Sequence, residues 1–188
     1  MKALIIKSSY RSGSNSSILA DKIAEGLSGS IVQIEDIGRA VISNCRGCYA
    51  CMAPGNKSYC IIKDDMHSFY DTLAEADIIV FAAPIYWFNV CGQIKQFIDR
   101  MFAVAVLKNE QGKSVLADKT IAAALVYGDV DPLRSGCVNA VRMFQDLCSY
   151  TGAKWGGVVY GTANDPKEML NNSALLEDAS LLGKSLIQ

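Results

Sequence analysis

Hydrophobic residues concentrate in five short segments of the chain. These segments are Lys2–Lys7, Ser30–Ile34, Asp77–Ala83, Thr120–Val126 and Lys154–Tyr160. Their length is typical of β-strands. An unbroken apolar run such as Asp77–Ala83 is typical of a strand that a parallel sheet buries on both faces. The pattern therefore predicts five strands, with the most apolar ones in the middle of a sheet.

Between these segments, apolar residues recur at helical spacing. The spacing predicts a first helix over residues 18–27, and Asp64 or Asp65 is a candidate cap for a helix that carries Met66 to Ala74. Further helices are expected over residues 94–102, 138–147 and 173–187. Strands that alternate with helices predict an α/β fold, here a three-layer, doubly wound, five-stranded parallel sheet.

The segments outside this alternation of strands and helices do not indicate a domain boundary. Residues 38–63 carry four cysteines together with Gly and Pro. This composition predicts an irregular loop, which we call the excursion. Residues 108–119 are polar and predict a loop. The sequence has no internal repeat, low-complexity tract or interdomain linker, so residues 1–188 are expected to form a single domain.

Composition narrows the class of protein. The chain has 188 residues, of which 51% are apolar, and its 18 Lys and Arg against 19 Asp and Glu give a net charge of −1. This much apolar material rules out intrinsic disorder, and near-neutrality argues against a nucleic-acid-binding protein. The longest apolar run, Ile78–Phe88, is too short to cross a membrane. Lys7 interrupts the apolar start before it could form a secretory signal, so we expect a cytoplasmic protein without membrane contact.

The loop after the first strand has the composition of an anion site. Ser8–Ser16 offers five hydroxyls together with Arg11, and it leads into a helix N-terminus whose free N–H groups favour an anion. A phosphate monoester suits these donors. The spacing matches neither a Walker A loop nor Gly-x-Gly-x-x-Gly. The alternative is that Ser and Asn simply cap the helix after a turn.

Two further loops follow strands of the predicted sheet. Pro84–Val90 contains three consecutive aromatic residues, and Tyr127–Pro132 is a turn after the fourth strand. Ligands of doubly wound sheets bind at the carboxyl ends of the strands, where these loops lie. Aromatic residues there can line a pocket for a flat ring, or they can pack in the core or at a subunit interface. Together with the phosphate loop, they favour a ligand with one phosphate and one planar ring.

Both loops resemble those of the flavodoxin-like NAD(P)H-dependent FMN reductase family. The stretch Lys7–Leu19 is similar to that family's phosphate loop, with Ser8 and Tyr10 where the family usually has Gly and Pro. The stretch Ala83–Arg100 is similar to its second signature. The resemblance implies bound FMN and NAD(P)H as co-substrate. It also implies electron transfer to a small acceptor such as a flavin or a quinone.

The resemblance also assigns roles to individual residues. The FMN phosphate would be held by Ser9, Arg11, Ser14, Asn15 and Ser16. The isoalloxazine ring would be flanked by Pro84, Ile85, Tyr86, Trp87, Phe88 and Asn89 on one side and by Tyr127, Gly128 and Asp129 on the other. Because the chemistry belongs to the cofactor, no side chain is expected to serve as catalytic acid, base or nucleophile. The single histidine, His67, is expected to be an ordinary surface or half-buried residue.

Seven cysteines are unusual for a chain of this kind. Four of them form the pattern Cys45-x2-Cys48-x2-Cys51-x8-Cys60, whose first three members have the spacing of [4Fe–4S] ligands. The pattern resembles that of iron–sulfur flavoproteins, although their fourth cysteine usually follows more closely. The alternatives are free or redox-active thiols near the flavin, or a zinc site. The other three cysteines, Cys91, Cys137 and Cys148, are expected to be small buried residues.

The function predicted first is therefore an FMN-dependent NAD(P)H oxidoreductase. The alternative is an electron carrier that holds FMN and a [4Fe–4S] cluster, and a third class is a flavin-binding protein without turnover. The aromatic residues Tyr86–Phe88 also predict that a second subunit covers the flavin. Family resemblance then implies a homodimer or a homotetramer.

Overall fold

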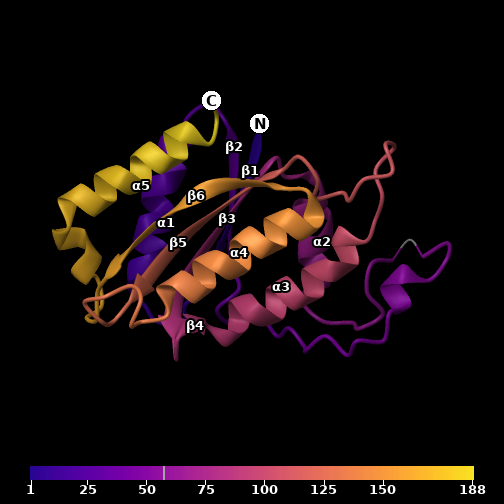
Figure 1. The fold of residues 1–188 in the computed structure, drawn as a ribbon, viewed down its shortest axis with the longest axis horizontal. Coiled ribbons are helices and arrows are strands. Elements are labelled where there is room, and N and C mark those ends of the chain that lie inside the picture. The colour runs from indigo at the N-terminus through magenta and orange to yellow at the C-terminus, as the bar shows by residue number, and fades with distance from the viewer. Residues whose placement is uncertain (57) are drawn as a thin grey trace.

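The protein is built around a parallel sheet with the strand order β2-β1-β3-β5-β6 (Figure 1). The computed structural model describes residues 1–56 and 58–188. The five parallel strands are β1 (Lys2–Lys7), β2 (Ile31–Asp36), β3 (Ile78–Tyr86), β5 (Thr120–Tyr127) and β6 (Lys154–Thr162). The predicted five-stranded parallel sheet is thus confirmed. A sixth strand of two residues, β4 (Asn89–Val90), pairs antiparallel with the end of β3 and is too short to be seen in the hydrophobic pattern.

Helices cover both faces of the sheet and complete three layers (Figure 1). One face carries α1 (Asn15–Gly26) and α5 (Ser173–Ser185), and the other carries α2 (His67–Glu75), α3 (Gly92–Ala105) and α4 (Cys137–Thr151). Alternate residues of each strand supply the two cores, because successive side chains of a strand point to opposite faces. In β1, for example, Ile5 packs with the first helix pair and Ile6 with the second group.

The central strands are apolar on both faces because both faces are covered. Residues 78–83 of β3 are fully buried, as the unbroken apolar run predicts. On one face the helices α1 and α5 approach very closely at Gly26 and Gly183. A Cβ on Gly183 would lie 2.2 Å from the carbonyl oxygen of Ile23, so only glycine permits this approach.

The predicted cap before α2 is formed by Asp64 and not by Asp65: Asp64 Oδ1 accepts from the N–H of Met66 at 3.1 Å, in the turn that leads into the helix. The helix begins after Met66, which has no side-chain cap bond. The carboxylate of Asp64 also binds Arg100, whereas that of Asp65 accepts from the N–H of Val41. Both aspartates therefore attach the ends of the excursion to the rest of the fold. The predicted helices all form, with boundaries shifted by a few residues.

Register decides where the loops of the sheet meet. Lys7 at the end of β1 pairs with Ala82 of β3, and Pro84 of β3 pairs with Val126 of β5. The carboxyl ends of three neighbouring strands therefore lie at one edge, where a doubly wound sheet binds ligands. Among the described residues, no helix has both the length and the apolar character that spanning a bilayer requires.

Candidate functional site

The loop that follows β1 is folded around hydroxyl groups. The Ser8 hydroxyl donates to the carbonyl oxygen of Ala82 at 2.9 Å and anchors the loop to β3. Ser14 caps α1, because its hydroxyl accepts from the N–H of Ser17, and it also contacts the hydroxyl of Ser16 at 3.0 Å. The cap leaves other first-turn N–H groups of α1 free for an anion. The helix-capping interpretation and the anion-site interpretation are thus compatible.

The three predicted loops meet at one cavity of about 230 Å³. Ten of the fourteen residues assigned to FMN line it. They are Ser9, Arg11, Ser14, Asn15, Ser16, Pro84, Ile85, Tyr86, Tyr127 and Gly128. Hydroxyl groups and a helix N-terminus lie on one side, and apolar and aromatic side chains lie on the other. This division suits a ligand with a phosphate at one end and a planar ring at the other.

The electrostatics of the cavity also suit an anion. Arg11 is the only formally charged side chain among the described residues that line it. Burial raises the pKa of Tyr127, and nearby Cys137 and Tyr160 act in the same direction. The Tyr127 phenol therefore stays neutral at physiological pH and adds no negative charge opposite the phosphate loop.

A tight hairpin places two aromatic residues beside the cavity. Trp87 and Phe88 form the two-residue turn between β3 and β4, and both have positive φ angles of 49° and 71°. Two-residue hairpin turns with positive φ angles usually contain Asn followed by Gly. Bulkier side chains such as Trp and Phe are strained in this backbone conformation. Asn139 of α4 donates to the Phe88 carbonyl at 3.2 Å, and a Cβ on Gly136 would lie 2.3 Å from that same oxygen. Close packing against α4 therefore holds the strained turn.

Four of the assigned residues do not line the cavity, and three lining residues were not assigned. Trp87, Phe88, Asn89 and Asp129 lie outside the lining, and Trp87 is 91% exposed. The additional lining residues are Val126, Ala163 and Asn164. Val126 could have been found from its place at the end of β5. Ala163 and Asn164 follow β6, whose loop carries no recognisable motif.

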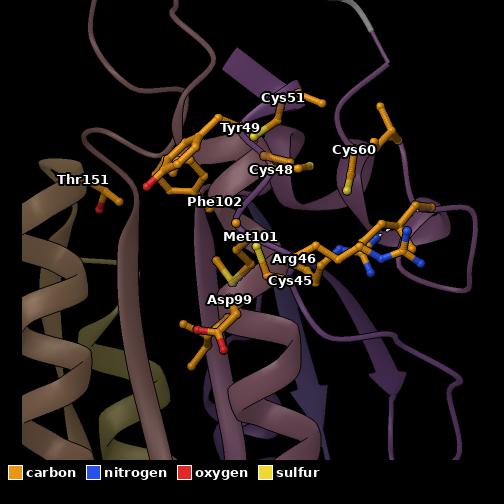
Figure 2. A pocket seen from close by; sticks show the side chains of 18 of the residues that line it. Cys45, Arg46, Cys48, Tyr49, Cys51, Cys60, Asp99, Met101, Phe102 and Thr151 are labelled. Carbon is orange, nitrogen blue, oxygen red and sulfur yellow. Dashed lines mark hydrogen bonds between the residues drawn. The ribbon is translucent and has the colours of Figure 1, made fainter. Parts of the chain in front are cut away.

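The four clustered cysteines line a second, larger groove of about 350 Å³. Figure 2 shows Cys45, Cys48, Cys51 and Cys60 on its loop side, near Met101 and Phe102 of α3. The groove is lined by the last turns of α3 and α4, whereas the aromatic hairpin precedes the first turn of α3. The two cavities share no lining residue. Within one chain, the thiols therefore line a different cavity from the one that suits the cofactor.

The excursion that carries these cysteines is fastened to α3 by a buried arginine. The Arg100 guanidinium binds both carboxylate oxygens of Asp64, at 2.7 and 3.1 Å. It also donates to the carbonyls of Ser43 and Ile62 and to the hydroxyl of Tyr70, at 3.0, 3.3 and 3.2 Å. The two charged side chains are only 1% and 6% exposed, so the pair is shielded from water. Arg100 thus joins both ends of the excursion to one point of the fold.

Burial and pairing act in opposite directions on these charges. Burial disfavours ionisation of Asp64, but Arg100 and the N–H groups of Ser43 and Met66 together hold the pKa of Asp64 below its usual value. Burial likewise disfavours the charge on Arg100. Bonds to Asp64 and Tyr70 outweigh that effect and raise the pKa of Arg100. Both groups are therefore charged throughout the physiological range.

The excursion is also ordered by its own contacts. The Asn56 amide donates to the carbonyl oxygens of Ala50, Cys51 and Tyr59, at 3.4, 3.3 and 2.9 Å. The Tyr59 ring stacks on Tyr70 at a centroid distance of 4.8 Å. Within residues 1–56 and 58–188, no three His, Cys, Asp or Glu side chains are grouped as metal ligands. The four thiols as arranged therefore do not form a ready-made cluster or zinc site.

The remaining candidate residues are part of the packing. Cys91, Cys137 and Cys148 are buried, which confirms the prediction for these three. His67 is half-buried as expected, and its ring lies edge-on to Tyr70 at 5.3 Å. Burial raises the pKa of Cys137 and Cys148 to about 11, so their thiols stay protonated and unreactive.

Comparison with known proteins identifies the class of protein that this fold and cavity define. A protein of Bacillus subtilis, YwqN, whose name describes an NAD(P)H-dependent FMN-containing oxidoreductase, is 27% identical over 98% of this chain and 97% of its own. An iron–sulfur flavoprotein of Archaeoglobus fulgidus is 35% identical over 62% of this chain and 54% of its own. The solved NAD(P)H:quinone oxidoreductase of Methanothermobacter marburgensis has the same fold. Its TM-score is 0.75 at 18% identity, and the match covers 100% of this chain and 98% of that one.

The fold is thus that of flavodoxin-like flavoenzymes. The sequence model of the NADPH-dependent FMN reductase family matches residues 1–158, and the chain belongs to this family. It is an oxidoreductase that uses FMN with NAD(P)H. The matched region includes the three loops around the 230 Å³ cavity and also the cysteine excursion.

The Asp64–Arg100 pair generates a stability prediction. Asp64→Asn leaves Arg100 buried without a countercharge and should lower the free energy of unfolding by about 3 kcal/mol near neutral pH. The pKa of Asp64 is depressed in the folded state. Its contribution is therefore complete above the unfolded pKa near 4 and is lost as the pH falls through the folded value. Urea unfolding at several pH values measures the difference.

The matched control is Asp99→Asn on the same helix. Asp99 pairs with Lys95 at the surface, where such a pair contributes less than about 1 kcal/mol. Equal destabilisation by the two substitutions, or a difference that does not shrink in acid, would contradict the role given to Arg100.

Proposed function

We propose that the cavity between the three loops binds FMN, with the phosphate at the N-terminus of α1 and the isoalloxazine against the β3 and β5 ends. The observation that carries the proposal is the convergence of ten independently assigned residues on one cavity. The fourteen assigned positions remain the proposed site, and the whole of residues 1–188 the proposed FMN-binding domain.

Different residues would bind the phosphate and the ring of FMN. Arg11, the serine hydroxyls and the first-turn N–H groups of α1 would hold the phosphate through charge-assisted hydrogen bonds. Asn15 is already engaged: its amide donates to the Asp165 carbonyl and its oxygen accepts from the N–H of Met169, at 2.8 and 3.1 Å. It would therefore contribute through its backbone. Pro84, Ile85 and Tyr86 would exclude water from one face of the ring.

FMN, when bound, supplies the two-electron chemistry that joins NAD(P)H to an acceptor. The protein has to orient the ring and leave one face open for NAD(P)H and the acceptor in turn. We propose a small planar acceptor, a flavin, a quinone or a similar molecule. The exposed ring of Tyr86 in the cavity lining supports this choice, as does the quinone named for the solved structural relative.

A spectroscopic titration tests the proposed function. Protein incubated with FMN and freed of excess ligand should retain about one flavin per chain. Anaerobic NADPH should bleach the flavin absorbance, and a quinone added afterwards should restore it. A protein that takes up no FMN under these conditions would overturn the proposal.

Riboflavin provides the control for the phosphate site, because it lacks only the phosphate. Arg11→Ala should weaken FMN binding roughly tenfold or more, the effect of losing a charge-assisted hydrogen bond, and leave riboflavin binding unchanged. Equal losses for both ligands would mean that the phosphate does not lie at Arg11.

We further propose that a second subunit covers the aromatic hairpin in a homodimer or homotetramer. Trp87 is 91% exposed, and Val130 and Leu133, shortly before Gly136, are 86% and 69% exposed. Gly136 packs directly on Phe88, so these apolar side chains surround one end of α4. Apolar surface of this kind marks protein interfaces.

Light scattering tests the assembly. The wild-type protein should have the mass of two or four chains, and Leu133→Asp should lower that mass, because it places a charge inside the proposed interface. Ile31→Asp, at an equally exposed apolar position of β2, should leave the mass unchanged. A monomeric wild-type protein would rule the assembly out.

A second candidate function is that of an iron–sulfur flavoprotein. The four thiols on one groove and the 35% identity to the Archaeoglobus fulgidus protein favour it. Two observations argue against it. Among the described residues, no three His, Cys, Asp or Glu side chains lie close enough together to hold a metal ion, and eight residues separate Cys51 from Cys60. Protein contacts of Asn56 and Arg100 also bind the excursion to itself and to α3. We therefore place the activity on FMN alone.

Chemical analysis separates the two candidates. Protein purified without oxygen should contain less than one iron and one sulfide per chain, and the exposed thiols of Cys45 and Cys48 should react with a thiol reagent in the folded protein. About four irons with four sulfides per chain, lost in Cys48→Ser, would establish the alternative.

A further inference from the structure

We propose that the turn after β6, residues 163–169, is a positioning element for the cofactor, and that Glu168 holds it in place. The turn, defined here by Ala163 to Met169, joins β6 to α5 at the yellow-orange end of the chain in Figure 1. It lies beyond the family match, which ends at residue 158. The inference rests on the proposed FMN site.

The turn first fixes the phosphate loop. Arg11 donates through Nη1 to the carbonyl oxygen of Asn164 at 2.6 Å. The N–H of Lys167 donates to the carbonyl of Gly13 at 2.9 Å. The aliphatic part of Lys167 covers Gly13 so closely that a Cβ there would lie 2.9 Å from it. Both ends of the Arg11–Gly13 segment are therefore supported by the turn.

The same turn also fixes the loop on the ring side. The N–H of Ala163 donates to the carbonyl of Tyr127 at 3.0 Å, and the Asn164 amide donates to the carbonyl of Gly128 at 3.2 Å. A Cβ on Gly128 would lie 2.6 Å from the amide oxygen of Asn164. Ala163 and Asn164 themselves line the cavity. One short segment thus bridges the two loops that would hold opposite ends of FMN.

Glu168 gives the turn its shape. Its Oε2 accepts from the N–H groups of Asn164 and Asp165, at 2.6 and 2.9 Å. These bonds lower the pKa of Glu168 and keep the carboxylate ionised. The carboxylate therefore determines the direction of the Asn164 carbonyl, which in turn receives Arg11.

The energetic effect comes from preorganisation. An exposed arginine explores many rotamers, and ordering it only upon binding would lower affinity. With one N–H already bound to Asn164, Arg11 is held at the wall of the cavity before the ligand arrives, and its other donors remain available to a phosphate. Loss of the Glu168 carboxylate should therefore weaken phosphate binding without removing any residue that lines the cavity.

The experiment measures FMN and riboflavin affinity by quenching of flavin fluorescence. Glu168→Ala should raise the Kd for FMN roughly tenfold, the effect of one charge-assisted hydrogen bond, and change the Kd for riboflavin much less. Glu168→Gln keeps an acceptor oxygen and should restore most of the affinity. Glu177→Ala, an exposed acid on α5, controls for the lost charge.

A double-mutant cycle with Arg11 shows whether the effect passes through this side chain. In the Arg11→Ala background, Glu168→Ala should change the Kd for FMN by less than about twofold. Full additivity, or equal losses of FMN and riboflavin affinity, would reduce the turn to a general structural role and overturn the inference. So would an unchanged Kd in Glu168→Ala. Failure of the wild-type protein to bind FMN would instead overturn the proposed function.

Discussion

The parallel pairing of β1, β3, β5 and β6 is the constraint on which the cavity depends. Lys7 lies opposite Ala82, Pro84 opposite Val126, and Tyr127 opposite Thr162, so four loops leave the sheet at nearly the same level. A shift of one residue would turn every buried side chain of a strand to the other face, where different helices pack. The two cores therefore fix the register, and the register fixes the positions of Ser9, Tyr86 and Gly128.

Sequence reasoning predicted the sheet well because its signal is strong. Continuous apolar runs indicate strands that are buried on both faces of the sheet, and β3 is the clearest case. It also predicted most of the cavity, since the carboxyl ends of neighbouring parallel strands must lie together. It failed where a contact depends on side chains distant in the sequence. The expected cap by Asp64 forms, but the sequence did not reveal that the same carboxylate also binds Arg100, 36 residues further on.

The turn after β6 illustrates the same difficulty. Asn164 and Glu168 are ordinary residues of a polar loop, and only the tertiary contact with Arg11, 153 residues away in sequence, gives them a role. The cysteines show the opposite case. Their spacing is conspicuous, yet the fold carries them to the last turns of α3, outside the lining of the proposed cofactor cavity. Spacing indicates which residues can act together, whereas topology decides what they act on.

Arg100 has a consequence for how this part of the chain can vary. It binds the carbonyl of Ser43 and the carboxylate of Asp64, so the excursion leaves and rejoins the fold at two fixed points. The entropy of closing a loop changes only slowly with its length once the ends are held. We therefore expect insertions, deletions or exchanged cysteines in the exposed part of the loop between those points to disturb the sheet and the proposed flavin cavity little. Such an arrangement would let the number of cysteines in the excursion evolve separately from the redox chemistry of the domain that carries it.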